Sequence, residues 1–238
     1  MGEWTRHEPF VSQVKIGSGG HGQTDRIHHA ERILVRVHEE TGPFRSPETI
    51  VQSTVIFNLL DRYISIQYLD TRFGPLILGS FGERLCLCDW KNRKTRTAVD
   101  RRIQQGLKAT YMEEESDVTR KAADQLNEYL NLVRTKFDLT LLPVGTSFQK
   151  KVWEELIRIP FGKTETYLGL ARKIRDDKMI RAVAAASGAN ALSIFVPCHR
   201  LVGSHGELTG YAGGKEVKRK LLLLEKSSRF PGQFQLFT

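Results

Sequence analysis

The 238-residue sequence contains only three cysteines, Cys86, Cys88 and Cys198. Such a sparse, odd set forms no disulfide framework, which excludes a disulfide-stapled secreted scaffold and indicates a reducing compartment. No apolar run approaches the ~18 residues of a membrane helix. The opening residues, MGEWTRHEPF, lack the apolar core of a signal peptide. We therefore predict a cytoplasmic protein with no membrane partner.

The sequence also has fewer acidic than basic residues. The net charge is +9, and +8 of it is carried by residues 146–238, which contain 16 Lys and Arg but only 8 Asp and Glu. A basic surface can simply be solvated, but here the excess is concentrated in one region of the chain. A polyanion, most simply a nucleic acid, would bind there through counterion release.

Composition divides the chain into three segments: a flexible extension over 1–53, a first domain over 54–142 and a second over 143–238. The extension contains the glycine-rich GSGGHGQ and the proline-broken TGPFRSPE. It also holds five of the seven histidines: His7, His21, His28, His29 and His38. These could form a metal site, but no cysteine accompanies them, so we interpret them as part of a solvated tail and predict no metal.

The first domain begins with strand patterns. YISIQYLDT alternates, and FGPLILGSF and ERLCLCDW follow after glycine-containing turns, which predicts an antiparallel meander. Helices are predicted over 96–107 and 117–136, the second with Val133 in the core. Cys86 and Cys88 lie two residues apart and so should share a strand face. We interpret them as apolar packing rather than a metal or redox pair, because no partner ligands are nearby.

The second domain shows helix signals. Thr146 and Gln149 form a T-x-x-Q capping box, and Pro160 and Gly162 are expected to end that helix. Helices predicted over 167–174 and 178–187, joined by a three-residue turn, resemble a helix-turn-helix. The alanines of the second helix suit close approach to a nucleic-acid backbone. An ordinary helical hairpin packed in a core explains the pattern equally well.

The stretch SIFVPCHRL carries the candidate nucleophile. An apolar, strand-like run over 194–196 is halted by Pro197, and Cys198 and His199 follow at once. The pair alone leaves function open, because a cysteine after a buried run is commonly inert packing.

VPCHRL and the following GELTGYAGG resemble the active-site signature of the O6-alkylguanine-DNA alkyltransferases, also called methylated-DNA–protein-cysteine methyltransferases. Leu201 is a departure, since valine or isoleucine is usual after PCHR. The resemblance covers residues 63–225 and is strong from residue 146 onward. Distant positions also fit its spacing: Tyr167, Arg181, Asn190, Tyr211 and Glu225. It implies an α+β protein with an N-terminal ribonuclease-H-like antiparallel sheet with helices. The C-terminal part would be a winged-helix-like, helix-turn-helix DNA-binding domain.

The resemblance also implies the chemistry. An alkyl group would pass from O6-alkylguanine, and from O4-alkylthymine, in double-stranded DNA to Cys198. The transfer would occur once per molecule and without a cofactor. His199 would activate the thiol through a water, and Glu225 would orient His199. Asn190 would hold the active-site turn, and Tyr167 would donate a proton to the departing guanine.

The alkylated base must leave the helical stack to be reached. By resemblance, Arg181 fills the gap from the minor groove, and Ala182 and Tyr167 make further DNA contacts. Arg200 is a further candidate for a phosphate contact, although a solvated face explains it equally well. The expected pocket residues are Tyr211, Ala212, Gly213 and Pro197. The protein is expected to act as a monomer. Two other readings are a helix-turn-helix binding module with an incidental cysteine and a Cys-His hydrolase.

Overall fold

The computed structural model describes residues 63–174 and 177–225, which belong to one compact unit spanning Thr49–Thr238. They form mixed α+β structure, which confirms the predicted α+β class. The proposed boundaries after residues 53 and 142 remain predictions. Everything inferred for residues 1–53, including the five histidines, lies outside the described residues. In the part that is described, no helix is long and apolar enough to span a membrane.

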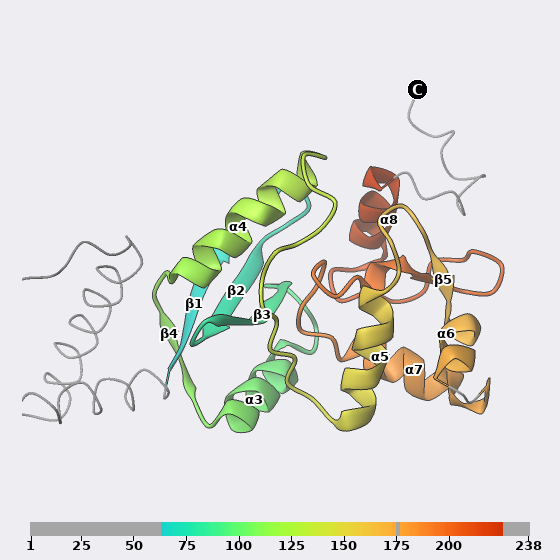
Figure 1. Ribbon diagram of the computed structural model, residues 1–238, viewed down its shortest axis with the longest axis horizontal. Coiled ribbons are helices and arrows are strands. Elements are labelled where there is room, and N and C mark those ends of the chain that lie inside the picture. Colours follow the sequence, from blue (N-terminus) through green and yellow to red (C-terminus); the bar gives the residue numbers. More distant parts are fainter. Residues whose placement is uncertain (1–62, 175–176, 226–238) are drawn as a thin grey trace, which may run out of the picture. The chain divides into compact units, whose positions relative to one another are not determined.

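Four strands form a sheet in the order β3-β2-β1-β4 (Figure 1). The predicted meander is confirmed, because β1 (Tyr63–Leu69), β2 (Leu76–Phe81) and β3 (Arg84–Trp90) pair antiparallel. The sheet is nevertheless not purely antiparallel. A fourth strand that the sequence pattern did not reveal, β4 (Thr110–Glu113), pairs parallel with β1. A parallel pair needs a crossover, and α3 (Arg96–Leu107) supplies part of it.

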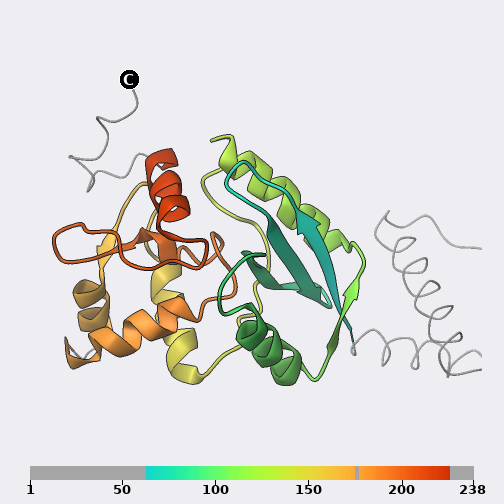
Figure 2. The same ribbon diagram turned by 180° about the vertical axis from the view of Figure 1, so that it is seen from behind.

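Helices cover the two faces of the sheet, α3 on one and α4 (Asp117–Leu130) on the other (Figures 1 and 2). The bounds of α3 match the predicted helix, but α4 ends six residues before the predicted 136. Leu132 has φ 61°, a left-handed conformation that a helix does not continue through. Val133, expected in the core, is therefore 77% exposed.

Cys86 and Cys88 do not share a strand face as predicted. The β2–β3 register shifts between Gly79 and Ser80, which makes Cys86 the extra residue of a β-bulge. Cys86 consequently packs in the cluster beneath α3, and Cys88 packs in the cluster beneath α4. Burial raises the pKa of Cys86 to about 12 and that of Cys88 well above its ordinary value. Both thiols are therefore protonated at neutral pH.

Strand β3 lies at the edge of the sheet, and its outer side binds the chain just before Cys198. Cys88 N donates to Ala191 O at 2.8 Å, and Ser193 N donates to Cys88 O at 2.6 Å. Such pairing satisfies an edge that would otherwise be exposed. It also ties the candidate active-site segment to the N-terminal sheet.

The remaining elements surround a two-stranded parallel sheet (Figure 1). They are α5 (Ser147–Ile157), β5 (Glu165–Thr166), α6 (Tyr167–Lys173), the 3₁₀ turn η1 (Asp177–Met179), α7 (Ile180–Gly188), β6 (Leu201–Val202) and α8 (Lys215–Leu224). The capping box of Thr146 and Gln149 is present as predicted. Helix α5 ends at Ile157, earlier than the Pro160 and Gly162 stop signals.

Candidate active site around Cys198

Cys198 follows a tight turn and not the strand predicted over 194–196. Ile194 has φ 73°, and Val196 N donates to Leu192 O at 2.7 Å. A β-branched residue at positive φ costs about 1–3 kcal/mol and persists only where its surroundings enforce it. The bonds to the edge of β3 provide part of that enforcement. The apolar residues of this run are buried for packing, which is why their pattern resembled a strand.

Asn190 connects this turn to the sulfur. Its Nδ2 donates to Val196 O at 2.9 Å and to Cys198 Sγ at 3.2 Å, while its Oδ1 accepts from Leu192 N at 2.9 Å. Asn190 is 2% exposed, so water competes little for these bonds. Burial raises the pKa of Cys198, although the Asn190 hydrogen bond lowers it. The resting thiol is therefore protonated and needs a base to become a nucleophile.

His199 is that candidate base. It lies in the 3₁₀ turn η2 (Cys198–Arg200) and is fully buried, with Nε2 2.9 Å from Glu225 Oε1. Burial lowers the pKa of His199 more than the neighbouring carboxylate raises it, so the ring is neutral at pH 7. With Nε2–H donating to Glu225, Nδ1 carries a lone pair. Among the described residues Nδ1 has no hydrogen-bond partner, which leaves it able to accept a proton.

Glu225 binds more than the histidine. Its Oε1 accepts from Tyr129 OH at 2.6 Å and Arg200 Nη2 at 2.9 Å, and its Oε2 accepts from Gly162 N at 3.1 Å. Gly162 has φ 72°, and a Cβ there would lie 2.9 Å from Glu225 O, so this approach requires glycine. Burial raises the pKa of Glu225, but His199 and Arg200 together hold it well below its usual range. Glu225 is thus ionised.

Arg200 was predicted to contact DNA, and the structure contradicts this. Its side chain is buried, pairs with Glu225 and donates from Nη1 to Ile159 O at 2.5 Å. A guanidinium committed in this way cannot reach a phosphate at the surface. The sequence around Arg200 does not indicate its partner, because Glu225 lies 25 residues further along the chain.

A cavity of about 800 Å³ opens beside Cys198, which lines it. Five of the predicted site residues also line it: Tyr167, Arg181, Tyr211, Ala212 and Gly213. Ala182 and Pro197 do not, and neither do Asn190, His199 and Glu225, which are buried. The structure thus separates a group at the cavity wall from a group that supports Cys198 from within the core.

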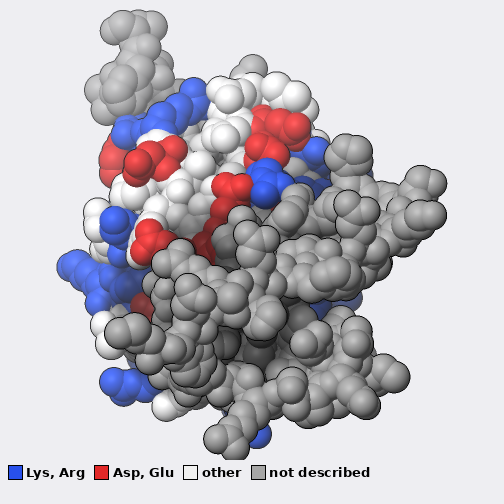
Figure 3. All heavy atoms as spheres, turned by 90° about the vertical axis from the view of Figure 1, so that its left-hand side faces the viewer, with Lys and Arg blue, Asp and Glu red and all other residues white. Residues whose placement is uncertain are grey.

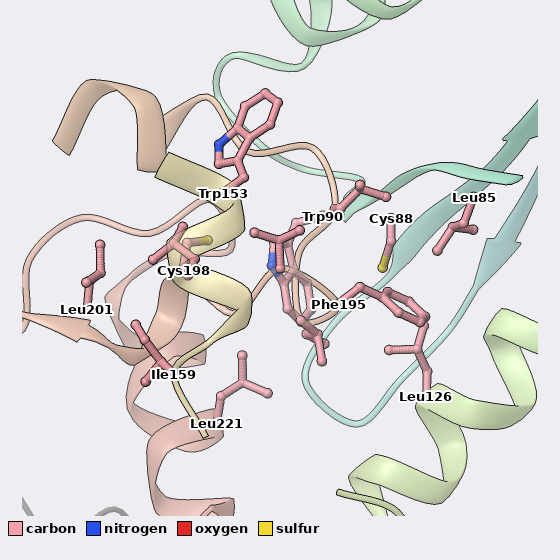
Figure 4. Close-up of a cluster of buried hydrophobic side chains, with 14 of the residues drawn as sticks. Leu85, Cys88, Trp90, Leu126, Trp153, Ile159, Phe195, Cys198, Leu201 and Leu221 are labelled. Carbon is pink, nitrogen blue, oxygen red and sulfur yellow. The ribbon is translucent and has the colours of Figure 1, made fainter. Parts of the chain in front are cut away.

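Sequence reasoning missed Trp90 of the N-terminal sheet, which does not line the cavity itself but packs behind two residues that do, Tyr211 and Gly213. Its ring lies edge-on to Tyr211 with centroids 6.2 Å apart. A Cβ on Gly213 would lie 2.7 Å from the Trp90 ring, so the loop can lie this close only with glycine there. Trp90, Cys88 and Cys198 belong to one hydrophobic cluster that joins both halves of the described chain (Figure 4).

A second missed residue is Lys218 of α8. It is fully buried, and its Nζ lies 3.3 Å from Thr209 Oγ1, which in turn lies 2.7 Å from Tyr167 OH. Burial lowers the pKa of Lys218 to about 8, although the nearby Cys198 opposes this shift. The helical period held a usable signal, because Lys218 precedes the buried Leu221 and Leu222 by three and four residues and so shares their face.

The geometry places a thiol and a tyrosine on one cavity wall and a buried neutral imidazole in the core next to the thiol, which suits displacement at a carbon of a bound substrate. In the described ranges, no group of three or more His, Cys, Asp and Glu side chains is arranged to hold a metal ion.

Residues 147–227 match the family described as "6-O-methylguanine DNA methyltransferase, DNA binding domain". A methylated-DNA–protein-cysteine methyltransferase from Methanosarcina barkeri is 38% identical over 160 residues, which is 67% of this chain and 96% of the relative. The chain belongs to the methylated-DNA–protein-cysteine methyltransferase family. The resemblance seen in VPCHRL is thereby confirmed.

Other members of the methylated-DNA–protein-cysteine methyltransferase family agree. The constitutive enzyme of Bacillus subtilis is 40% identical over 167 residues, covering 68% of this chain and 98% of its own. The crystal structure of Mycobacterium tuberculosis OGT in complex with DNA aligns with TM-score 0.58 and 38% identity, over 69% of this chain and 93% of that one. The protein is accordingly a cysteine methyltransferase of DNA repair, with the mixed α+β fold of that structure.

Proposed function

We propose that Cys198 is the acceptor of the alkyl group, which it takes from O6-alkylguanine in double-stranded DNA in one irreversible transfer. The observation that carries this proposal is the position of its sulfur. Of the three cysteines, Cys198 alone lines the cavity, while Cys86 and Cys88 are buried in the sheet. The buried Asn190 and the His199–Glu225 pair support it from the core.

In the first step the Cys198 thiol gives its proton, through a water, to Nδ1 of His199. Glu225 favours this because its charge stabilises the imidazolium that forms. The thiolate then attacks the alkyl carbon as the bond from that carbon to guanine O6 breaks, and the electron pair of the broken bond stays on the guanine. General base assistance of this kind contributes roughly 10²–10⁴-fold to a rate.

The departing guanine must gain a proton. Tyr167 lines the cavity, and its hydroxyl is the proton donor in this proposal. Thr209 and Lys218 stand behind it and replace the proton, and the imidazolium of His199 later releases one to solvent. In the net reaction the thiol hydrogen is lost, guanine gains one proton, and Cys198 becomes a thioether. The thioether is stable, so each molecule acts once, and no step requires a cofactor.

The base must be turned out of the duplex to enter the cavity, at a cost of a few kcal/mol. Arg181 lies on α7, is exposed and lines the cavity. A residue that fills the gap left in the base stack must have such a position. Ala182 next to it is half-buried on the same helix and lets the DNA backbone approach closely. O4-alkylthymine presents the same alkyl–oxygen bond on a smaller base, so we propose it as a second substrate.

The finer description of the fold belongs to the same proposal. The sheet with α3 and α4 would be a ribonuclease-H-like domain, and α5 to α8 with β5 and β6 would be a winged-helix-like domain that uses α6 and α7 as its helix-turn-helix. A monomer suffices, because all the residues invoked come from one chain. A thiol that must stay reduced fits a cytoplasmic protein.

The test is a single-turnover reaction with a duplex that contains one O6-methylguanine, followed by mass analysis of the peptides. We expect one methyl group on the Cys198 peptide, none after Cys198→Ala, and unchanged transfer after Cys86→Ala. An unmodified Cys198 beside intact substrate would overturn the proposal. Retardation of the duplex without modification indicates a binding module, and repeated turnover indicates a hydrolase.

Arg181 is tested with two substrates. Arg181→Ala should slow transfer from duplex DNA far more than transfer from the free base O6-benzylguanine, because only the duplex requires the base to be extruded. Arg101→Ala, an exposed arginine on α3, is the matched control and should change neither rate. Equal losses of Arg181→Ala on both substrates would remove the extrusion role.

A further inference from the structure

The loop between β3 and α3 also lines the cavity. Its residues 92–95 stand on the wall together with Cys198 and with Arg181 and Ala184 of α7. This β3–α3 loop (residues 91–95) reads KNRKT and belongs to the N-terminal half, to which neither the sequence nor the mechanism assigned a DNA contact. The cavity is thus built from both halves of the described chain.

Arg93 fixes this loop in place. It is 7% exposed, and its Nη1 donates to Asp89 Oδ2 at 2.7 Å and to Asn190 O at 2.7 Å, while Nη2 donates to Gly188 O. Arg102 Nη2 donates to Ala189 O at 2.6 Å. Two guanidinium groups therefore bind three successive carbonyls at the C-terminal end of α7, where the helix dipole favours cations. The loop is held at a set position against α7.

The outer side chains of the loop face solvent. Asn92 and Lys94 are exposed, and within the described ranges neither side chain makes a hydrogen bond or an ion pair. One acid shares the cavity, Glu207, whose carboxylate accepts from His205 N at 2.9 Å. Lys94 and Arg181 are thus exposed cations on one cavity wall, contributed by the N-terminal and C-terminal halves.

The face in Figure 3 differs. Where grey atoms do not cover it, Lys and Arg side chains are intermixed with Asp and Glu. A mixed surface gives a polyanion little net attraction, whereas exposed cations beside a cavity attract it locally. The cavity side is therefore the better match for DNA phosphates.

We propose that the β3–α3 loop is a second DNA-contacting element, in which Lys94, with Asn92 beside it, binds a phosphate of the strand that carries the alkylated base. The proposal rests on the proposed function, because the strand comes to the loop only when its base enters the cavity. An extruded nucleotide brings its own flanking phosphates to the mouth of the pocket. Contacts to phosphates position a protein on DNA without reading sequence.

The first test is the salt dependence of duplex binding by Lys94→Ala. Loss of one phosphate contact should reduce the slope of log K against log salt concentration by about 0.9 and weaken binding roughly fivefold near physiological salt. Transfer from free O6-benzylguanine should be unchanged. The control is Lys121→Ala on α4, another exposed lysine, which pairs with Asp138, does not line the cavity and should leave the slope unaltered. A slope for Lys94→Ala equal to that of Lys121→Ala overturns the proposal.

The second test identifies the phosphate. In a series of duplexes, one phosphate at a time is replaced by an uncharged methylphosphonate, in either strand near the O6-methylguanine. At one position in the alkylated strand the replacement should weaken wild-type binding and have no further effect on Lys94→Ala. Coupling found only in the opposite strand, or at no position, contradicts the assignment. If the wild type binds but transfers no methyl group, the proposed function fails, while the slopes still decide the role of the loop.

Discussion

Asp89 on β3 and Glu225 at the end of α8 are both buried carboxylates that bind arginine, yet they serve different ends. Asp89 Oδ2 lies 2.7 Å from Arg93 Nη1 and 3.1 Å from Arg96 Nη1, and its Oδ1 accepts from Ser193 Oγ at 3.2 Å. Arg93 uses its remaining donors on carbonyls and on a threonine hydroxyl. The Asp89 cluster therefore connects the sheet to the segment before Cys198 and leaves no group poised for chemistry.

The Glu225 cluster is built in the same way but contains one exception. Tyr129 and Arg200 are committed to the carboxylate as fully as Arg93 is to Asp89. His199 binds it through one ring nitrogen only. We infer that a buried charge network is purely structural unless one member, here His199, keeps a titratable atom without a protein partner. That member can be changed without dismantling the rest.

The substitution His199→Gln tests most directly whether His199 serves the chemistry and not the structure. The glutamine amide can still donate toward Glu225, but it cannot take a proton from Cys198. We expect methyl transfer from duplex DNA to fall about 10³-fold. The free energy of unfolding should change by only about 1 kcal/mol, because the hydrogen bond is replaced. The measurements are single-turnover rates and urea unfolding. Parallel loss of rate and stability would make His199 a structural residue like Arg93.

Asp89→Asn should give the opposite result. It leaves the buried Arg93 without its counter-ion, which should cost about 3 kcal/mol in the free energy of unfolding. The transfer rate of the protein that remains folded should change far less than in His199→Gln. Asp100→Asn is the control, since Asp100 pairs with Arg96 but is 23% exposed and should cost less than about 1 kcal/mol. A 10³-fold loss of transfer in Asp89→Asn would show that the two clusters do not differ as described.

Local signals in the sequence predicted local structure well. The strand patterns and glycine-containing turns between Tyr63 and Trp90 correctly predicted three strands, and the spacing of Thr146 and Gln149 correctly predicted a capping box, because these signals depend on near neighbours. The motif around Cys198 led to the correct family. The fit of distant positions also placed Asn190 and Glu225 in the core with Cys198 and His199.

What failed depends on contacts distant in sequence. The run over 194–196 became a turn because the edge of β3 binds its neighbours, and the bulge that separates Cys86 from Cys88 arises in the register with β2. Arg200 was interpreted as a surface cation because its neighbours in the sequence do not indicate that it pairs with Glu225. No periodicity indicates that Arg93 reaches the end of α7. These are the features that join the two halves.

The dependence of stability on pH should distinguish the contributions of His199 and Glu225. Both His199 and Glu225 have a folded-state pKa below the unfolded values of about 6.5 and 4.3, so the unfolded chain binds protons first. Stability should therefore fall as pH drops below about 6.5 through His199, and again below about 4.3 through Glu225. Urea unfolding across pH should show that His199→Gln loses the first decline and keeps the second. An unchanged first decline would assign it to other groups.

Lys218 is also a buried cation, but unlike Arg93 and Arg200 it has no carboxylate within ion-pair distance among the described residues. Its pKa of about 8 means that it loses its proton just above neutrality. If it replaces the proton of Tyr167, transfer should decline as pH rises through about 8, and Lys218→Met should be about tenfold slower at pH 7 without that decline.

The same substitution should raise stability, because methionine fills the site without a charge that burial penalises. For the wild type the folded pKa lies below the unfolded value of about 10.4, so this group's contribution to stability should increase between about pH 8 and 10.4, and Lys218→Met should lack that increase. A variant that unfolds less readily but transfers more slowly separates chemistry from support within one side chain. Lower stability together with slower transfer would place Lys218 with Asp89 instead, as part of the framework.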